Sequence, residues 1–283
     1  MTIEDIDAIR ARFADKICTG IEPFPSAVRD AFARVPRENY LGPGPWSVLT
    51  RQGYRLTPDD SVAQVYQPAA IALDADRNIN NGEPQLHARM LAAAAPKAGE
   101  TVVHVGAGSG YYTAILAELV GATGFVTAYE IVESVGRMAK VNLASTTNAE
   151  VHMVSGIDAL AKADVIYVCA GATRPAIAWL EALNPGGRLV FPLTPEEGFG
   201  GVLCVTRISD DNPVMDARFV SPTMFIACEG AREQSEGEAL SSVFQEKNMM
   251  SVRALRRDGS PDETCWFAWS NDLWLSTSIA AKQ

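Results

Sequence analysis

The stretch that decides the fold is Val103-His-Val-Gly-Ala-Gly-Ser-Gly-Tyr-Tyr112, written VHVGAGSGYY. A short apolar run leads into glycines at alternate positions, Gly106, Gly108 and Gly110, and the helical pattern YTAILAELV follows. This order predicts a buried strand, a tight turn and a helix that begins at the turn. Because the first N–H groups of a helix have no partner within the helix, such a turn favours an anionic ligand.

Strand-like and helix-like segments alternate regularly around this turn. The predicted strands are TVVHV, GFVTAYE, VHMV, DVIYVCAG, RLVFPL and VLCVTRI, and the predicted helices between them are YTAILAELV, VESVGRMAKVNLA and RPAIAWLEAL. Strands and helices that alternate at this spacing predict an α/β fold with a mainly parallel, doubly wound, Rossmann-like sheet.

The pattern divides the chain into three predicted parts. Residues 1–90 contain two helical patterns and then a stretch rich in Pro, Gly and Asn, which together predict an N-terminal helical and loop-rich lobe. Residues 91–208 form the predicted Rossmann-like core. Residues 209–283 have a less regular pattern with several aromatic residues and two strand-like runs, SVRAL and TCWFAW, so we expect a C-terminal lobe packed on the sheet.

Composition excludes several classes of protein. A net charge of −10, with Arg253, Arg256 and Arg257 as the one local basic cluster, argues against a nucleic-acid partner. No apolar run approaches the roughly 18 residues of a membrane-spanning helix, so no membrane partner is predicted. The five cysteines form no CxxC pair, which favours reduced thiols in a cytoplasmic protein and no metal site.

The glycine spacing distinguishes between two classes of cofactor. The dinucleotide fingerprint GxGxxG would place its third glycine at position 111, where this chain has Tyr111. The alternate spacing is instead that of enzymes that bind S-adenosyl-L-methionine (SAM), in which bare backbone approaches the methionine part of the cofactor. The predicted contacts to this part come from the turn and its neighbours: His104, Gly106, Ala107, Gly108, Gly110 and Tyr111.

Acidic residues after the next strands extend this prediction. Glu130 ends the second predicted strand, where a carboxylate can accept hydrogen bonds from both ribose hydroxyls, with Ile131 beside it. NAD enzymes use the same device, so Glu130 indicates an adenosine cofactor without choosing between the two. In SGIDAL, Gly156 and Asp158 follow the third strand, and Asp158 is either a ligand of the adenine amino group or a helix N-cap.

Three segments of the chain resemble protein-L-isoaspartate O-methyltransferases. VPRENYLGP at residues 35–43 is similar to a VPRE segment of that family, and VHVGAGSGYYTAILAELVG is similar to its glycine motif. The run DVIYVCAGATRPAIAWLEALNPGGRLVFPL is similar to the family's fourth and fifth strands. The resemblance covers residues 28–208. It implies a SAM-dependent enzyme that esterifies a carboxylate, with isoaspartyl protein as the family's substrate.

The chain departs from this family near the expected acceptor site. Asn80-Asn81-Gly82-Glu83-Pro84 corresponds to a Thr-Ile-Ser-x-Pro motif, so Gly82 replaces a serine that faces donor and acceptor. His104 replaces an acid that orients the cofactor's amino group, and His87 corresponds to a family histidine near the cofactor. Asn80 and Asn81 are therefore candidates to supply amide donors to a carboxylate in place of the lost hydroxyl.

These observations predict a SAM-dependent O-methyltransferase acting on a carboxylate of a small molecule, peptide or protein, with isoaspartyl protein disfavoured. A carboxylate is ionised at neutral pH and needs no base, whereas a phenol or amine acceptor would need one, for which His87 is the candidate. Two alternatives remain open at this point: a SAM-binding sensor or scaffold without catalysis, and an NAD-dependent oxidoreductase. The identity of the acceptor and the oligomeric state are not predicted.

Overall fold

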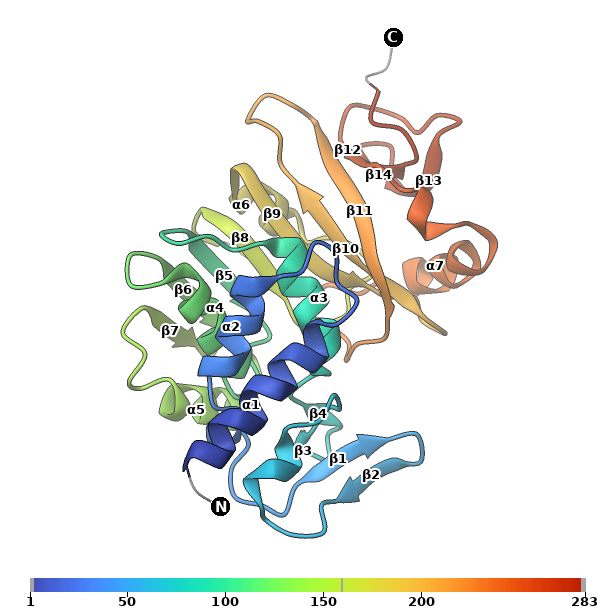
Figure 1. Cartoon of the computed structure of the whole chain (residues 1–283). Coiled ribbons are helices and arrows are strands. Elements are labelled where there is room, and N and C mark those ends of the chain that lie inside the picture. The colour runs from blue at the N-terminus through green and yellow to red at the C-terminus, as the bar shows by residue number, and fades with distance from the viewer. Residues whose placement is uncertain (1–2, 159, 281–283) are drawn as a thin grey trace. The chain divides into compact units, whose positions relative to one another are not determined.

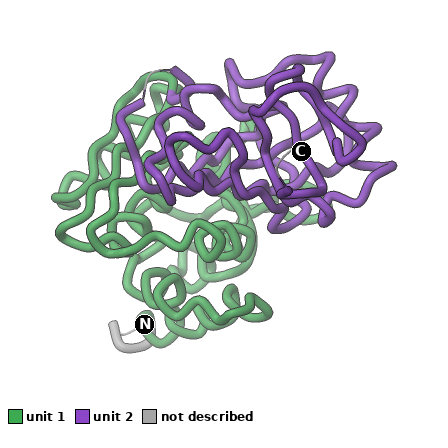
Figure 2. Tube along the Cα trace, turned by 90° about the horizontal axis from the view of Figure 1, so that it is seen from above, with its two compact units in different colours: residues 1–155 green, residues 156–283 purple. Residues whose placement is uncertain are grey.

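The computed structural model describes residues 3–158 and 160–280 in two compact units, which Figure 2 distinguishes by colour. Unit 1 ends at Ser155 and unit 2 begins at Gly156. This boundary falls inside the stretch 91–208 that we predict as the core. The three-part division from the sequence remains a prediction.

Helices form one layer of unit 1. They are α1 (Ile3–Cys18), α2 (Ser26–Arg34) and α3 (Pro84–Ala94), and α1 packs against both of the others (Figure 1). Phe13 and Ile17 lie four residues apart on one face of α1, and both are buried. Phe32 of α2 is also fully buried and meets Phe13 edge to face.

The Pro-, Gly- and Asn-rich stretch of unit 1 has short elements and a small core of its own. Its 3₁₀ helices are η1 (Arg37–Tyr40) and η2 (Val62–Val65). Its strands form two antiparallel pairs, β1 (Ser47–Thr50) with β2 (Gly53–Leu56) and β3 (Ala72–Asp74) with β4 (Ile79–Asn80) (Figure 1). The buried side chains of this small core are Leu41, Trp46, Val48, Val65 and Ile71.

The sheet of unit 1 is parallel. Its strands are β5 (Thr101–Val105), β6 (Phe125–Tyr129) and β7 (Ala149–His152), paired in that order, and α4 (Tyr111–Val120) and α5 (Glu133–Asn142) connect them. Four of the five residues of β5 are buried, as expected for a parallel strand covered on both faces. The predicted α/β fold is confirmed.

Unit 2 begins with a parallel pair, β8 (Ala163–Val168) and β9 (Leu183–Leu193), joined through α6 (Ile177–Ala182). The helix is shorter than the predicted RPAIAWLEAL. The strand is longer than RLVFPL and includes Asn184-Pro-Gly-Gly187, which we expected only to end the helix. A register shift between Ala163 and Val165 of β8 accommodates the additional residues.

Beyond β9 the strands of unit 2 are antiparallel. They are β10 (Gly200–Thr206), β11 (Val214–Thr223), β12 (Ala254–Arg256), β13 (Cys265–Ser270) and β14 (Leu273–Ser276), in the spatial order β9-β10-β11-β12-β14-β13 (Figure 1). The pairing of β13 with β14 shifts register twice. The chain after residue 208 therefore extends the sheet edge, whereas we expected a lobe packed on the sheet.

The remaining elements of unit 2 are α7 (Gln234–Glu246) and η3 (Met249–Ser251). Phe244 of α7 packs edge to face on Trp266 of β13, and both rings meet Phe219 of β11. These aromatic residues of the C-terminal region thus form part of the core of unit 2. None of the helices in the described part of the chain is long and apolar enough to span a membrane.

Candidate functional site

The glycine turn follows β5 and is hydrogen-bonded to the carboxyl end of β6. The N–H groups of Gly106 and Ala107 both donate to the carbonyl oxygen of Tyr129, at 2.9 and 3.0 Å. Gly106, Gly108 and Gly110 have φ angles of 79°, 57° and 93°, which side chains other than glycine rarely adopt. A Cβ atom at Gly110 would also lie 2.9 Å from Cδ1 of Leu143. The three glycines are therefore required by the backbone.

The turn leaves room for a ligand at its middle and at the start of α4. A Cβ atom at Gly108 would touch only Cδ1 of Leu73, at 3.6 Å. Gly110 is the N-cap residue of α4 and has no side chain that could accept from the first N–H groups of the helix. Such N–H groups bind anions readily, because they carry the positive end of the helix dipole.

Glu130 connects this turn to the end of β6. Its Oε2 accepts from the Gly108 N–H at 2.8 Å and its Oε1 accepts from the Val132 N–H at 2.9 Å. The side chain is 7% exposed, and burial raises the pKa of its carboxyl despite the opposing hydrogen bonds. Since a carboxylate can accept about four hydrogen bonds, Glu130 retains capacity for a diol. The neighbouring Ile131 is exposed.

The side chains of His104 and Tyr111 lie in the core. His104 is fully buried, its Nδ1 lies 2.9 Å from Oγ1 of Thr113 on α4, and burial lowers the pKa of its imidazole to about 3. Tyr111 is 1% exposed and packs against Phe32 and Tyr40. A ligand at the turn would therefore contact the backbone of these two residues and not their side chains. The sequence pattern does not distinguish these two kinds of contact.

Asn80 and Asn81, before α3, are already engaged in hydrogen bonds. The amide nitrogen of Asn80 donates to Oη of Tyr54 at 3.0 Å, and its Oδ1 accepts from the Gly82 N–H at 2.9 Å. Asn81 is 6% exposed, and its Oδ1 accepts from the Ile71 N–H at 2.8 Å and from Arg37 at 3.3 Å. Asn80 is thus the more accessible of the two amides.

The imidazole of His87 lies directly against the backbone of Gly82. Gly82 has a φ of 72°, and a Cβ atom there would lie 2.2 Å from Nε2 of His87. The imidazole is 1% exposed and stacks on the ring of Tyr112 at 3.6 Å. Burial, and then His104 and Arg37, hold its pKa well below the usual value, so it is neutral at pH 7. The imidazole fills the volume that a side chain at position 82 would occupy.

Arg37 lies in the VPRE segment, but the sequence did not indicate a role for it near the candidate site. Its guanidinium is fully buried. It donates to the carbonyl oxygens of Val65, Gln67 and Ala69, at 2.6, 2.9 and 2.8 Å, as well as to Asn81. Arg37 thereby fixes the loop before β3 and the segment before α3 relative to each other.

Gly156 and Asp158 belong to unit 2. The carbonyl oxygen of Gly156 accepts from Nε1 of Trp179 at 2.8 Å, and the side chain of Asp158 is exposed. Their predicted contact with the adenine of a cofactor remains a prediction, since it depends on the placement of the two units.

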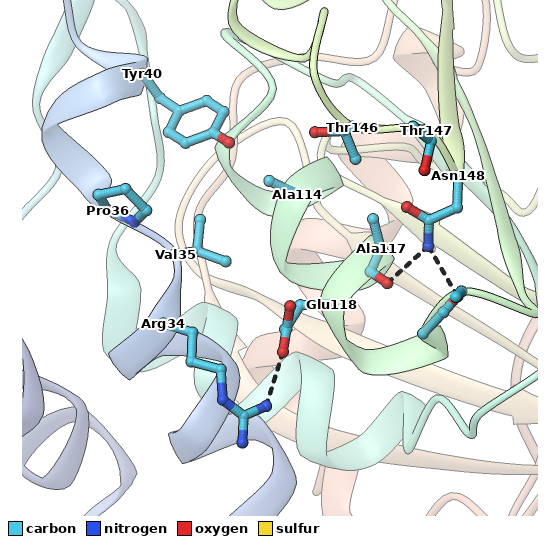
Figure 3. A pocket seen from close by; sticks show the side chains of 12 residues that line it. Arg34, Val35, Pro36, Tyr40, Ala114, Ala117, Glu118, Thr146, Thr147 and Asn148 are labelled. Carbon is cyan, nitrogen blue, oxygen red and sulfur yellow. Dashed lines mark hydrogen bonds and ion pairs between the residues drawn. The ribbon is translucent and has the colours of Figure 1, made fainter.

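Unit 1 also has a surface hollow of about 320 Å³, shown in Figure 3. One wall carries an ion pair between Arg34 Nη1 and Glu118 Oε1 at 2.7 Å, and another is held by Asn148, which donates to the carbonyl oxygens of Ala117 and Gly121. None of the site residues predicted from the sequence lines it. The complete lining is Arg34, Val35, Pro36, Tyr40, Ala114, Ala117, Glu118, Gly121, Ala122, Thr146, Thr147 and Asn148.

The sequence matches the family described as protein-L-isoaspartate(D-aspartate) O-methyltransferase over residues 24–233. The chain belongs to this family. As a protein-L-isoaspartate(D-aspartate) O-methyltransferase family member it is a SAM-dependent methyltransferase, as predicted, and the family match favours this activity over NAD-dependent oxidation.

Individual relatives agree with this assignment. The chain is 31% identical over 202 residues to protein-L-isoaspartate O-methyltransferase 2 of Marinobacter nauticus, covering 68% of this chain and 83% of that one. It is 32% identical over 206 residues to the Pyrobaculum neutrophilum enzyme of the same family, covering 71% and 89%. These identities place it as a divergent family member.

Solved structures show the same fold. A protein-L-isoaspartate O-methyltransferase structure aligns with a TM-score of 0.65 at 21% identity, covering 83% of this chain and 69% of that one. A Plasmodium falciparum structure described as a putative member, in complex with S-adenosyl-L-homocysteine, aligns with a TM-score of 0.60 at 15% identity, covering 79% and 98%.

Proposed function

We propose that this methyltransferase esterifies a carboxylate acceptor and that isoaspartyl protein is not its preferred substrate. The observation that carries the proposal is the Gly82–His87 pair. The imidazole fills the side-chain volume of position 82, so that the serine hydroxyl of the family's motif has no counterpart here. An altered acceptor site on an intact cofactor turn favours a different acceptor for the same chemistry.

The turn after β5 and Glu130 fit the proposed cofactor. We propose that backbone groups of the turn, from Gly106 to the first residue of α4, bind the methionine part, and that Glu130 binds the ribose hydroxyls. Ile131 would flank the adenine, and Gly156 and Asp158 remain residues predicted to contact it. The hydrogen bond between Gly108 and Glu130 supports this assignment, because it brings the turn and the carboxylate close enough to bind the same SAM molecule.

When bound, SAM supplies a methyl group on a positively charged sulfur. The chain must hold the acceptor oxygen about 3 Å from that carbon, in line with the bond that breaks, and exclude water. An acceptor carboxylate is anionic at pH 7, so no residue has to remove a proton. This agrees with His87 and His104, which are both buried and neutral and are poorly placed to act as bases.

Asn80 is the proposed contact to the acceptor carboxylate. Its amide is half-buried and could exchange the hydroxyl of Tyr54 for a carboxylate oxygen. Asn81 is buried, and its Oδ1 accepts from the N–H of Ile71 and from Arg37. We therefore propose that it fixes the segment before α3. Replacing Asn80 by Ala should reduce turnover while SAM affinity is retained.

A radiolabelled SAM assay tests the proposal. An isoaspartyl peptide is compared with panels of small carboxylic acids, phenols and amines, and the products are treated with base. We expect a carboxylic acid to be methylated and its label to be released as methanol, since methyl esters hydrolyse in base. Base-stable label on a phenol or amine would contradict the carboxylate acceptor. SAM binding by calorimetry without turnover on any panel would favour a sensor or scaffold.

A further inference from the structure

Among the described residues no carboxylate contacts the guanidinium of Arg37. Burial lowers its pKa, and Glu83 is the carboxylate whose charge raises that pKa from a distance. The two nearby acids have other partners. Glu38 pairs with Arg10 and accepts from Tyr66, whereas Glu83 accepts from the N–H groups of Gln85 and Leu86 at the start of α3. A fully buried cation without an anion in direct contact is unfavourable, because it loses the solvation of water.

Donors without acceptors surround this charge. Within the part of unit 1 that the structure describes, Arg37 Nε, Asn81 Nδ2 and Tyr111 Oη have no hydrogen-bond partner. The three side chains are 0%, 6% and 1% exposed, so bulk water does not reach them. The nitrogen atoms can only donate, and the hydroxyl can also donate. Because two of the three groups can only donate, the cluster has more donors than acceptors.

The three groups form one neighbourhood. Arg37 Nη2 lies 3.3 Å from Asn81 Oδ1, and the hydroxyl of Tyr111 is close enough to interact electrostatically with Arg37. The orientation of the Asn81 amide is settled by its partners, since Oδ1 accepts from two donors and a flipped NH₂ group would oppose both. Its Nδ2 is thus fixed as a donor beside the guanidinium.

We propose that Arg37, Asn81 and Tyr111 bind a small monovalent anion of the size of chloride in the core of unit 1. An anion accepts from every free donor and also balances the charge, whereas a water molecule accepts but leaves the charge unbalanced. The enclosure of all three side chains favours a monatomic ion over a carboxylate on a larger molecule. This site uses the side chain of Tyr111, whereas the proposed cofactor site uses its backbone, and the anion does not depend on the proposed acceptor.

The first test is thermal unfolding of the full chain at constant ionic strength, with sodium chloride exchanged for sodium gluconate. We expect Tm to rise with chloride and to keep rising with its logarithm above the dissociation constant, because the ion binds only the folded state. Bromide should act like chloride. Tyr111→Phe removes one donor and should raise the half-saturating concentration by about tenfold.

Asparagine-to-aspartate variants make the test specific. Asn81→Asp places a fixed negative charge beside Arg37, so its Tm should be the same in chloride and gluconate. Asn80→Asp is the matched control, because both polar atoms of Asn80 already have partners, and it should keep the chloride dependence. An equal chloride effect in native protein and Asn81→Asp would overturn the proposal, as would equal Tm values of native protein in the two salts.

Crystals of the native chain grown in sodium bromide provide a test that needs no variant. We expect an anomalous peak in hydrogen-bonding contact with Arg37 Nε. Bromide peaks confined to the surface, or none, would overturn the assignment.

Discussion

At position 82 the backbone and a neighbouring ring exclude a side chain for separate reasons. The φ of 72° disfavours any residue with a Cβ atom, and Nε2 of His87 stands where that atom would be. The departure from the family's serine is therefore more than the loss of one hydroxyl. A side chain placed here would point toward His87 in the core and could not face an acceptor without a change of the backbone.

We therefore expect Gly82→Ser to lower the free energy of unfolding by about 1–3 kcal/mol, through overpacking and backbone strain, and not to create isoaspartyl methylation. Combining it with His87→Ala should cost less than the sum of the two single changes, because the second change removes the clash. Urea unfolding of all three variants and an isoaspartyl peptide assay measure this. Additive costs, or activity gained by Gly82→Ser alone, would contradict the arrangement.

Glu130 carries the prediction for cofactor affinity. Glu130→Gln removes the negative charge and places an NH₂ group against either the Gly108 or the Val132 N–H, so SAM affinity should fall by about ten- to a hundredfold. In the native protein, affinity should decrease as the pH falls through the raised pKa of this carboxyl, which lies above that of an ordinary glutamate.

Calorimetric titration of SAM between pH 7 and pH 5 measures both effects. Glu133→Gln is the matched control, because Glu133 is an exposed residue of α5 paired with Arg137. It should leave SAM affinity unchanged. The role of Glu130 would be refuted by an affinity that Glu130→Gln does not lower.

At the scale of elements, α2 is held to α4 by packing far more than by charge. Phe32 is fully buried and meets the rings of Tyr111 and Tyr112, whereas Arg34 and Glu118 form an ion pair in solvent. Phe32→Ala should lower the free energy of unfolding by about 3–5 kcal/mol, and Arg34→Ala by less than about 1 kcal/mol. Chemical denaturation decides this, and comparable losses from the two variants would contradict the assignment.

The elements that the sequence predicts well are those with a local signal. The strand before Gly106 is nearly all apolar, and the glycines impose the turn whatever surrounds them. By contrast, the apolar face of α7 is short, because the helix buries Gly237 and Leu240 and adds only the packed ring of Phe244. In β11, Asp216 and Arg218 alternate with buried residues, which is a strand pattern that our prediction overlooked.

The same distinction applies to the candidate site. Gly108 and Glu130 follow successive strands of a parallel sheet, so the fold brings their chain positions together and the sequence could predict their proximity. The position of His87 under Gly82, and the buried guanidinium of Arg37, depend on how separate loops pack. No periodicity in the chain records such contacts.

For the whole molecule, the two buried histidines make stability depend on acid. His87 and His104 are buried and neutral, with lowered pKa values, whereas in the unfolded chain each takes up a proton near pH 6.5. Their contribution is fully present above pH 6.5 and is lost as the pH falls toward the lowered values. Each should reduce the free energy of unfolding by up to about 1.4 kcal/mol per pH unit.

Urea unfolding between pH 7 and pH 5 measures this slope. His104→Asn removes one of the two buried imidazoles. It should therefore reduce the slope of the unfolding free energy against pH by up to about 1.4 kcal/mol per pH unit, the contribution of one proton. His152→Asn is the control, because that side chain is exposed beside Glu150, and its slope should match the native one. A slope unchanged by His104→Asn would contradict the burial of a neutral imidazole.

The two register shifts in the β13–β14 pairing bear on how this protein behaves at high concentration. β13 is the outermost strand of unit 2, and a flat outermost strand offers its free amides and carbonyls to another molecule. Bulges twist such a strand and break the regular spacing that a second chain would need. We therefore expect the irregular β13–β14 hairpin to disfavour edge-to-edge assembly, and a variant with a straightened β13 to polymerise more readily in a light-scattering assay.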